Sequence, residues 1–363
     1  MSVVIFIVIL LVLVIAHEFG HFIVAKKAGM RVDEFAFGFP PKIFGIKKGE
    51  TEYNFNLLPI GGYVRIFGEN PNDESLVGKD SPRSFTSKSK RVQIAVLLAG
   101  VTMNFLVAWL LFSIGFMSGM PSSMSTNHKN AKIQNSELAI TAIMPDSPAY
   151  KSGLVVGDKI KKLSTKSDST EVPSVESIKY FVSKHKDEKI NVYFVRSGEE
   201  KTVELTPGKN DIGEPVIGIG MDMISTIKLA PHKAIWEGLK LSVNVFVSTC
   251  VGFYKLIANA VMGHGNFAAI SGPVGIVGIV GDVAHFGIIY LLSFTAIISI
   301  NLAVINLIPF PALDGGRILF VIIEKIKGSP IKPKIANVLN MIGFALLMLL
   351  MIIVTYKDIT KLM

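Results

Sequence analysis

The chain has 363 residues, of which 50% are hydrophobic and 18% are charged, and its mean hydropathy is +0.49. It is too apolar for an ordinary soluble domain and too charged to consist of membrane spans alone, so we expect membrane helices and at least one soluble domain. A net charge of +9 favours basic residues flanking spans on the cytoplasmic side over nucleic-acid binding, and the single cysteine, Cys250, excludes an intrachain disulfide and a cysteine-rich zinc site.

The first apolar run, Val3 to Ala25, is long enough to cross a bilayer. No basic region precedes it and no small-residue cleavage site follows it, so we expect a span rather than a signal peptide. Lys and Arg gather beyond Ala25, which predicts that this end lies in the cytoplasm and that the N-terminus lies outside.

The segment His17-Glu18-Phe19-Gly20-His21 lies inside this run and has the pattern H-E-x-x-H. In that pattern two histidines one helical turn apart bind zinc, and the glutamate is a general base beside the metal. Ionisable side chains in a membrane helix are costly and indicate function. Buried histidines that hydrogen-bond to neighbouring helices are the structural alternative. A zinc peptidase site also needs a third protein ligand and an open position for water.

Residues 34–70 are interrupted by Gly and Pro and contain runs typical of strands. Thr51 to Leu58 and Tyr63 to Phe67 are expected on either side of a turn at Pro59 and Gly61-Gly62. We therefore expect a membrane-associated β-hairpin or sheet. It either offers an edge to an extended substrate or is a loop at the membrane surface.

The second span is predicted from Val92 to Met117, and Asn104 in its middle could hydrogen-bond across helices. Residues 118–136 are rich in Ser and Asn and are expected to be a linker outside the membrane. Residues 137–227 combine strand patterns with a short capped helix near Ser147 and an amphipathic helix from Val175 to His185. This order resembles a bacterial-type PDZ domain, a class that binds chain ends or strands by edge addition; a spacer or steric gate is the alternative role.

Residues 231–262 form a long helical segment with charges at both ends and moderate polarity. The segment is long enough to span, but it also fits a helix that lies along the membrane interface. The third span is predicted from Ile288 to Ile308 and the fourth from Val338 to Thr355.

Pro309 and Pro311 break the chain after the third span, and Asp314 follows directly. If residues 231–262 lie at the interface, Asp314 arrives at the level of His17 and can be the third metal ligand. If they span, Asp314 emerges on the opposite side from the histidines. We therefore favour the interfacial position, although a helix cap in a turn is another role open to Asp314.

The sequence thus predicts an α-helical membrane protein with four transmembrane helices, a membrane-associated β-hairpin or sheet and an inserted α+β PDZ-like domain. Its expected parts are residues 1–117 with the first two spans and the β-element at 34–70, the linker 118–136, the PDZ-like domain 137–227, the interfacial helix 231–262, and residues 285–363 with the last two spans.

These motifs together resemble the site-2 protease family of intramembrane zinc metalloproteases, and are most similar to the bacterial regulator-of-sigma-E-protease type with a single PDZ domain. The resemblance rests on His17 to His21, Pro59 to Val64, the PDZ-like insert, Ser271 to Val274, and Asn306-x-x-Pro309-x4-Asp314-Gly315.

The resemblance implies that Zn2+ is bound by His17, His21 and Asp314, that Glu18 is the general base, and that Asn306 helps to hold the substrate or the oxyanion. The segment with Gly61, Gly62, Tyr63 and Val64 would take the substrate as an added strand. Substrates would be single-span membrane proteins, such as anti-sigma factors and signal-peptide remnants, cleaved in regulated intramembrane proteolysis after an upstream site-1-type protease.

We accordingly expect a multi-pass protein of the bacterial inner or plasma membrane, in contact with the lipid bilayer and without a nucleic-acid partner. Its active site should face the cytoplasmic side, and the PDZ-like domain should be extracytoplasmic. A non-proteolytic zinc-binding membrane protein and a PDZ-bearing membrane scaffold are the alternatives.

Overall fold

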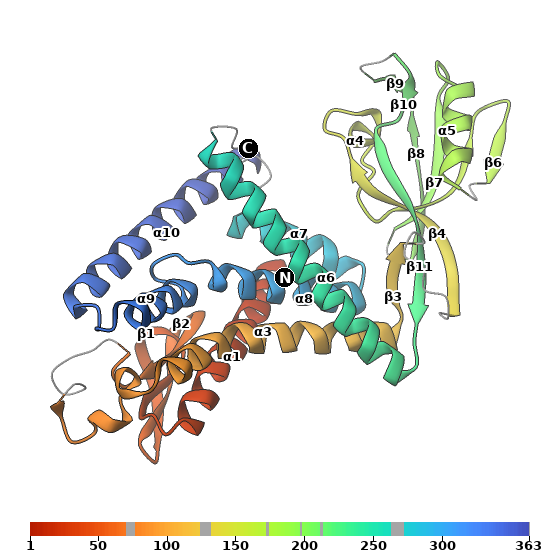
Figure 1. Ribbon diagram of the computed structural model, residues 1–363. Coiled ribbons are helices and arrows are strands. Elements are labelled where there is room, and N and C mark those ends of the chain that lie inside the picture. Colours follow the sequence, from red (N-terminus) through yellow and green to blue (C-terminus); the bar gives the residue numbers. More distant parts are fainter. Residues whose placement is uncertain are drawn as a thin grey trace. The chain divides into compact units, whose positions relative to one another are not determined.

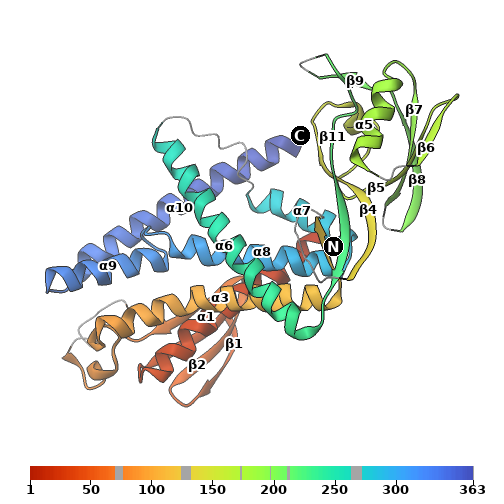
Figure 2. The same ribbon diagram turned by 45° about the vertical axis from the view of Figure 1, so that its right-hand side comes forward.

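The computed structural model describes residues 1–69, 77–123, 132–171, 174–196, 198–210, 213–262 and 272–362. The chain forms two compact units (Figures 1 and 2). The first contains Met1–Ser113, Ile235–Ala284 and Leu291–Met363, and the second contains Ile114–Ala234 and His285–Tyr290. Ser271, the first residue of the Ser271 to Val274 motif, lies outside the described residues.

Long apolar helices make up most of the first unit: α1 (Ser2–Lys27), α3 (Lys90–Ser118), α6 (Pro231–Val261), α8 (Ile288–Leu307) and α10 (Pro333–Leu362). All five are long and apolar enough to cross a membrane, whereas the sequence predicts four spans. The additional candidate is α6, because its length and composition satisfy the same criteria as the other four. Two shorter helices, α7 (Pro273–His285) and α9 (Asp314–Lys327), belong to the same part of the chain.

A small antiparallel sheet packs against α1 in the first unit. Its two strands, β1 (Val32–Lys48) and β2 (Thr51–Ile66), are long and bent, so that each contributes two paired segments. Residues 35–37 pair with 53–55 on one side and with 62–64 on the other, and residues 44–48 pair with 51–55. The segments therefore lie in the order 42–48, 51–56, 34–37, 62–65, and residues 62–65 form one edge of the sheet.

The expected turn at Pro59 and Gly61-Gly62 is instead a bend inside β2. Gly61 has φ +126°, a conformation that favours glycine. A Cβ on Gly62 would lie 2.7 Å from the carbonyl oxygen of Ala36, so glycine also allows the two strands to approach here. The two glycines explain how β2 continues through a bend at a position where the sequence predicts a turn between two strands.

The sheet is fixed to the helices by a buried apolar cluster. The cluster joins the end of α1, both strands, the short helix η2 (Phe85–Ser87), which follows η1 (Ser81–Arg83), and the helices α3 and α9. Its buried members are Ala25, Met30, Val32, Phe35, Val64, Ile66, Phe85, Val96, Leu97 and Val321. Because burial of apolar surface contributes about 25 cal/mol per Å², this cluster holds the edge strand and the H-E-x-x-H helix in one rigid frame.

The second unit is an α+β domain with a seven-stranded sheet in the order β3-β11-β4-β5-β7-β8, with β6 paired to β5. The strands are β3 (Met120–Ser123), β4 (Lys132–Ile143), β5 (Lys159–Ser164), β6 (Ser169–Glu171), β7 (Ile190–Arg196), β8 (Glu199–Leu205) and β11 (Ile219–Lys228). Two further strands, β9 (Gly208–Lys209) and β10 (Pro215–Val216), pair with each other, and the helices are α4 (Pro148–Lys151) and α5 (Val175–Lys184).

The apolar face of α5 packs on this sheet through Ile178, Phe181 and Val182. The prediction that residues 118–136 are a linker is wrong for part of that range, because β3 lies within it and β4 begins at Lys132. Both strands pair with β11 at the other end of the domain sequence. Strand pairing between residues about 100 positions apart is not visible in a local sequence pattern.

Candidate metal centre

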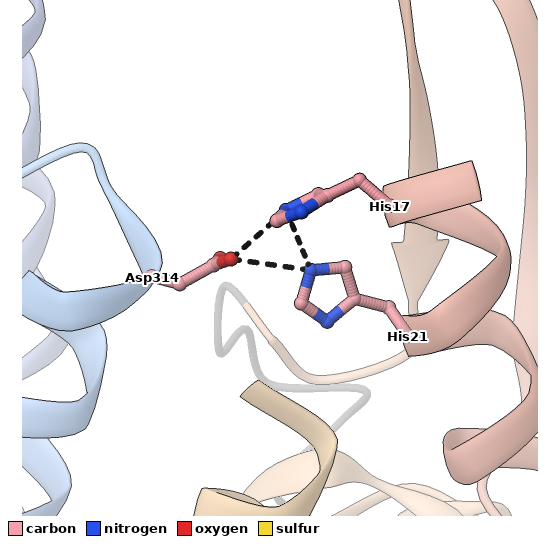
Figure 3. A group of neighbouring side chains, drawn as sticks. All are labelled: His17, His21 and Asp314. Atoms are coloured by element: carbon pink, nitrogen blue, oxygen red, sulfur yellow. Dashed lines mark hydrogen bonds and ion pairs between the residues drawn. The ribbon is translucent and has the colours of Figure 1, made fainter. Parts of the chain in front are cut away.

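Two histidines lie on one face of α1, where they point toward the same space (Figure 3). His17 and His21 are each only 7% exposed, and their Nε2 atoms are 3.1 Å apart. A separation of four residues puts side chains one above the other on a helix, which is why the two rings meet. The spacing read from the sequence therefore produces a convergent pair of nitrogen ligands.

Asp314 approaches this pair from a turn between α8 and α9. The turn contains Ala312 at φ +76°, and its N–H donates a hydrogen bond to Asn340 Oδ1 on α10 at 3.2 Å. The next glycine, Gly315, is packed so closely that a Cβ would lie 2.3 Å from the carbonyl oxygen of Ile308. The hydrogen bond of Ala312 and the close packing of Gly315 together fix the position of Asp314, the first residue of α9.

The three predicted ligands form a nearly equilateral triangle of donor atoms. Asp314 Oδ2 lies 3.0 Å from His17 Nε2 and 3.2 Å from His21 Nε2. Tetrahedral zinc with ligand bonds of about 2.0–2.1 Å has ligand atoms about 3.3 Å apart, so the triangle matches three corners of such a site. Apart from the two imidazole nitrogens, the buried Asp314 Oδ2 has no polar partner among the described residues, as expected for a carboxylate oxygen that a cation would satisfy. Among the described residues, this is the one group of three or more His, Cys, Asp or Glu that could hold a metal ion.

A glycine on α3 makes room for the imidazole rings. A Cβ on Gly100 would lie 2.4 Å from His21 Nε2 and 2.7 Å from His17 Nε2. Gly20 on α1 also allows the two helices to approach closely, because a Cβ added there would lie 2.4 Å from the carbonyl oxygen of Ala99. The metal centre therefore depends on α1 and α3 packing almost backbone to backbone, a feature that the sequence analysis did not find.

The outer nitrogens of both rings have polar neighbours on α3. His21 Nδ1 lies 2.8 Å from the carbonyl oxygen of Val96, and His17 Nδ1 lies 3.4 Å from Asn104 Nδ2. The sequence marks Asn104 only as a polar residue in an apolar span. A polar residue in an apolar span indicates that its side chain has a polar partner, but it does not indicate which residue that partner is.

Glu18 lines the same cavity as His17 and Asp314 and does not belong to the group of three side chains that could hold a metal ion. Its Oε2 accepts a hydrogen bond from the Val64 N–H at 3.0 Å, so the edge segment of the sheet contacts the H-E-x-x-H motif directly. The cavity that Glu18 lines has a volume of about 200 Å³. The cavity is lined by Val14, His17, Glu18, Asn104, Leu302, Asn306, Ala312, Leu313 and Asp314.

Of the remaining predicted site residues, one lines the cavity beside this centre and the others do not. Asn306, near the end of α8, lines the cavity with the ligands. Gly61 lies in the bend of β2 and Gly62 and Tyr63 in the edge segment that follows, and none of the three lines the cavity. The Tyr63 hydroxyl donates a hydrogen bond to Glu34 at 2.7 Å. Arg317, one turn after Asp314, pairs with Glu69 just beyond β2, a link between α9 and the sheet that the sequence analysis missed.

Comparison with known proteins identifies relatives over nearly the whole chain. A protein of Clostridium acetobutylicum named as a candidate zinc metalloprotease is 36% identical over 96% of this chain and 94% of its own length. Zinc metalloprotease RasP of Oceanobacillus iheyensis is 31% identical over 99% of both chains. The crystal structure of the PDZ domain of an SdrC-like protein from Listeria monocytogenes covers 25% of this chain and 92% of its own, at 16% identity and a TM-score of 0.22.

The family model of peptidase family M50 matches residues 5–350, a range that includes the H-E-x-x-H motif, the edge strand and Asp314. The chain therefore belongs to peptidase family M50, the site-2 protease family, and is a zinc-dependent metalloprotease.

Proposed function

We propose that His17, His21 and Asp314 hold the zinc ion of this metalloprotease and that Glu18 is the general base. The observation that carries the proposal is the convergence of the three ligand atoms next to a cavity that Glu18 lines. When bound, zinc polarises the scissile carbonyl and makes water nucleophilic at neutral pH. The protein supplies the remaining steps through its own side chains.

The carboxylate of Glu18 is positioned to move a proton during hydrolysis. It sits on α1 one residue after His17, and its Oε2 is held by the Val64 N–H. From there it would take the proton of the attacking water and return it to the leaving amine. The Asn306 amide, on the same cavity, would donate a hydrogen bond to the developing oxyanion.

We propose that the edge segment with Gly61, Gly62, Tyr63 and Val64 receives the substrate as an added strand. A peptide bond in a helix is shielded by the helix hydrogen bonds, so the substrate must unwind before it is cut. Main-chain hydrogen bonds to a sheet edge would replace those that are lost. The position of residues 62–65 at the edge and the contact between Val64 and Glu18 support this role.

We also propose four spans, with α6 at the membrane interface. The chain enters α6 beside the last part of α3, since a Cβ on Gly238 would lie 2.4 Å from Ser113 Oγ. The described chain resumes at Gly272, beside Asp358 near the end of α10. Because α3 and α10 both begin next to basic residues, their ends would belong to the same, outer side, so α6 would start on that side and the described chain would resume there at Gly272.

The same charges support the proposed orientation. Lys26 and Lys27 at the end of α1, Lys90 at the start of α3 and Lys325 in the last turn of α9 would face the cytoplasm, and the α+β unit would lie outside. A multi-pass protein of the bacterial inner or plasma membrane, with an active site open to the cytoplasm, fits this arrangement. Its substrates would be single-span proteins, first shortened outside by another protease.

The decisive experiment measures zinc content and cleavage on the full-length protein in detergent, with a single-span membrane peptide as substrate. His17→Ala, His21→Ala and Asp314→Ala should each lower zinc content. Glu18→Gln should keep zinc and reduce cleavage by about 10²–10⁴-fold, the usual contribution of a general base. Val12→Ala, at an exposed position on the same helix, is the control and should change neither quantity.

Each part of the proposal has its own contrary result. Unchanged zinc in Asp314→Ala would remove Asp314 from the ligand set, and full cleavage by Glu18→Gln would remove the general base. Bound zinc without cleavage in the unmodified protein would favour the non-proteolytic zinc protein. Absence of both would favour the membrane scaffold.

A further inference from the structure

Asn104 is a fully buried polar residue in the middle of α3, with 0% of its surface exposed. Its main-chain carbonyl accepts a hydrogen bond from Ser299 Oγ on α8 at 2.8 Å, which fixes the backbone. Its side-chain Nδ2 lies 3.4 Å from His17 Nδ1, and its buried Oδ1 has no hydrogen-bond partner among the described residues. Leaving a buried amide oxygen without a partner is destabilising, so a role for this side chain at the site would account for its position.

The two metal-binding imidazoles differ in how their outer nitrogens are held. His21 Nδ1 faces the carbonyl oxygen of Val96, which can only accept. That bond requires a proton on Nδ1 and therefore leaves Nε2 of His21 with a free lone pair. The backbone alone thus selects the metal-binding tautomer of His21.

His17 has the same requirement but a different neighbour. Its Nε2 is 3.0 Å from Asp314 Oδ2, so Nε2 is the atom that faces the metal position. A neutral imidazole that ligates through Nε2 carries its proton on Nδ1, and this proton needs an acceptor. An amide N–H₂ cannot accept it, whereas the amide oxygen can.

We propose that Asn104 is a positioning residue for the metal centre, with Oδ1 accepting the Nδ1–H of His17 when the metal is bound; this rests on the proposed ligand role of His17. A half-turn of the carboxamide exchanges Oδ1 and Nδ2 in nearly the same volume. This rotation gives the buried Oδ1 a hydrogen-bond donor, the Nδ1–H of His17, and the same hydrogen bond fixes the ring plane and the tautomer of His17. Because Ser299 holds the backbone at this point, the amide needs to turn only about its own side-chain bonds.

The test compares Asn104→Leu, which keeps the shape but cannot accept, with Asn104→Asp, which can only accept while its carboxylate is ionised. Zinc affinity is measured on the full-length protein in detergent by competition with a chromophoric chelator. Loss of an outer-shell partner typically weakens metal binding about 10–100-fold, so we expect that loss for Asn104→Leu and a change below about threefold for Asn104→Asp. Thr102→Val is the matched control, because Thr102 is exposed and its hydroxyl donates a hydrogen bond to the Leu98 carbonyl oxygen of its own helix.

A second measurement separates positioning from general damage to the fold. In a His17→Ala background the Asn104→Leu change should have no further effect on the residual zinc affinity, since its partner is gone. The visible spectrum of the cobalt-loaded protein should change for Asn104→Leu and not for Thr102→Val, because it reports ligand geometry. If Asn104→Leu does not fold, Asn104→Ala takes its place in both measurements.

Two results would overturn the inference. One is wild-type zinc affinity and an unchanged cobalt spectrum in the non-accepting variant. The other is an equal loss of affinity with and without His17. Both differ from failure of the proposed ligand set, in which His17→Ala itself would retain zinc at full affinity.

Discussion

Replacing Gly100 with alanine should disable the metal centre while leaving the fold in place. The added Cβ would lie 2.4 Å from His21 Nε2, 2.6 Å from His17 Cε1 and 2.7 Å from His17 Nε2. Ordinary contacts begin at 3.4 Å, so the nearest ring must retreat by about 1 Å. Alanine is favoured over glycine by about 1 kcal/mol inside a helix, which partly offsets the strain on α3 itself.

The displacement should appear in both metal binding and catalysis. A shift of about 1 Å removes a nitrogen from the bond length of about 2.0–2.1 Å that zinc requires. A misplacement of that size costs about 10²-fold in rate even when the reacting groups are unchanged. We therefore expect cleavage of a single-span peptide to fall at least about 10²-fold, together with a loss of tightly bound zinc measured by metal analysis.

The control is Gly252→Ala on α6, where a Cβ would meet no atom of the described residues within 4 Å. This variant should keep zinc and full activity and should melt at the same temperature or slightly higher, because the helix gains the same propensity. Wild-type zinc content and cleavage in Gly100→Ala would refute the geometry on which the metal centre is built. Loss of both functions in the control would refute the interpretation that the effect is local to the histidines.

Three further predictions test other contacts. Removal of zinc by a chelator should abolish cleavage and lower the melting temperature of the whole chain, and zinc should restore both; a zinc-free protein with full activity would contradict the ligand assignment. Asn340→Ala removes the acceptor of the Ala312 N–H in the turn before Asp314, and this should weaken zinc about fivefold, for a hydrogen bond worth about 1 kcal/mol; unchanged affinity would show that the turn holds itself. Arg196→Met leaves the fully buried Asp158 without its cation and should destabilise the α+β unit by about 3 kcal/mol in denaturant, whereas Lys189→Met at an exposed pair should change its stability by less than about 0.5 kcal/mol; equal effects would refute the buried pair.

The local parts of this protein follow from sequence periodicity and the chemistry of single residues. His17 and His21 must share a helix face because they are four residues apart in an apolar run that forms a helix. Pro309 and Pro311 must interrupt the chain before Asp314, because proline cannot continue the hydrogen bonding of a helix. The zinc-binding pattern and the candidate for its third ligand could therefore be proposed from the sequence, and the family match agrees with the metalloprotease chemistry that they imply.

Local reasoning alone does not decide the number of spans. Residues 231–262 carry charges at their ends, which favours the interface, yet α6 passes the same test of length and composition as the other long helices. Hydropathy measures only transfer from water to an apolar phase, and an interfacial helix and a span can satisfy it equally. The contact between Gly238 and Ser113, which places the start of α6 beside the last part of α3, carries additional information, and it depends on how these two helices pack.

By itself, the sequence determined which side chains are candidates for the chemistry and the helix or turn on which each lies, because those properties come from neighbours a few residues away. Only the tertiary structure decided that Asp314 reaches the two histidines across nearly 300 residues, that Gly100 provides the space for both rings, and that Asn104 faces His17. It also decided that one bent strand brings Val64 to Glu18. The reason is physical: contacts between distant segments depend on the shape of the packed interior, which no short stretch of the chain contains.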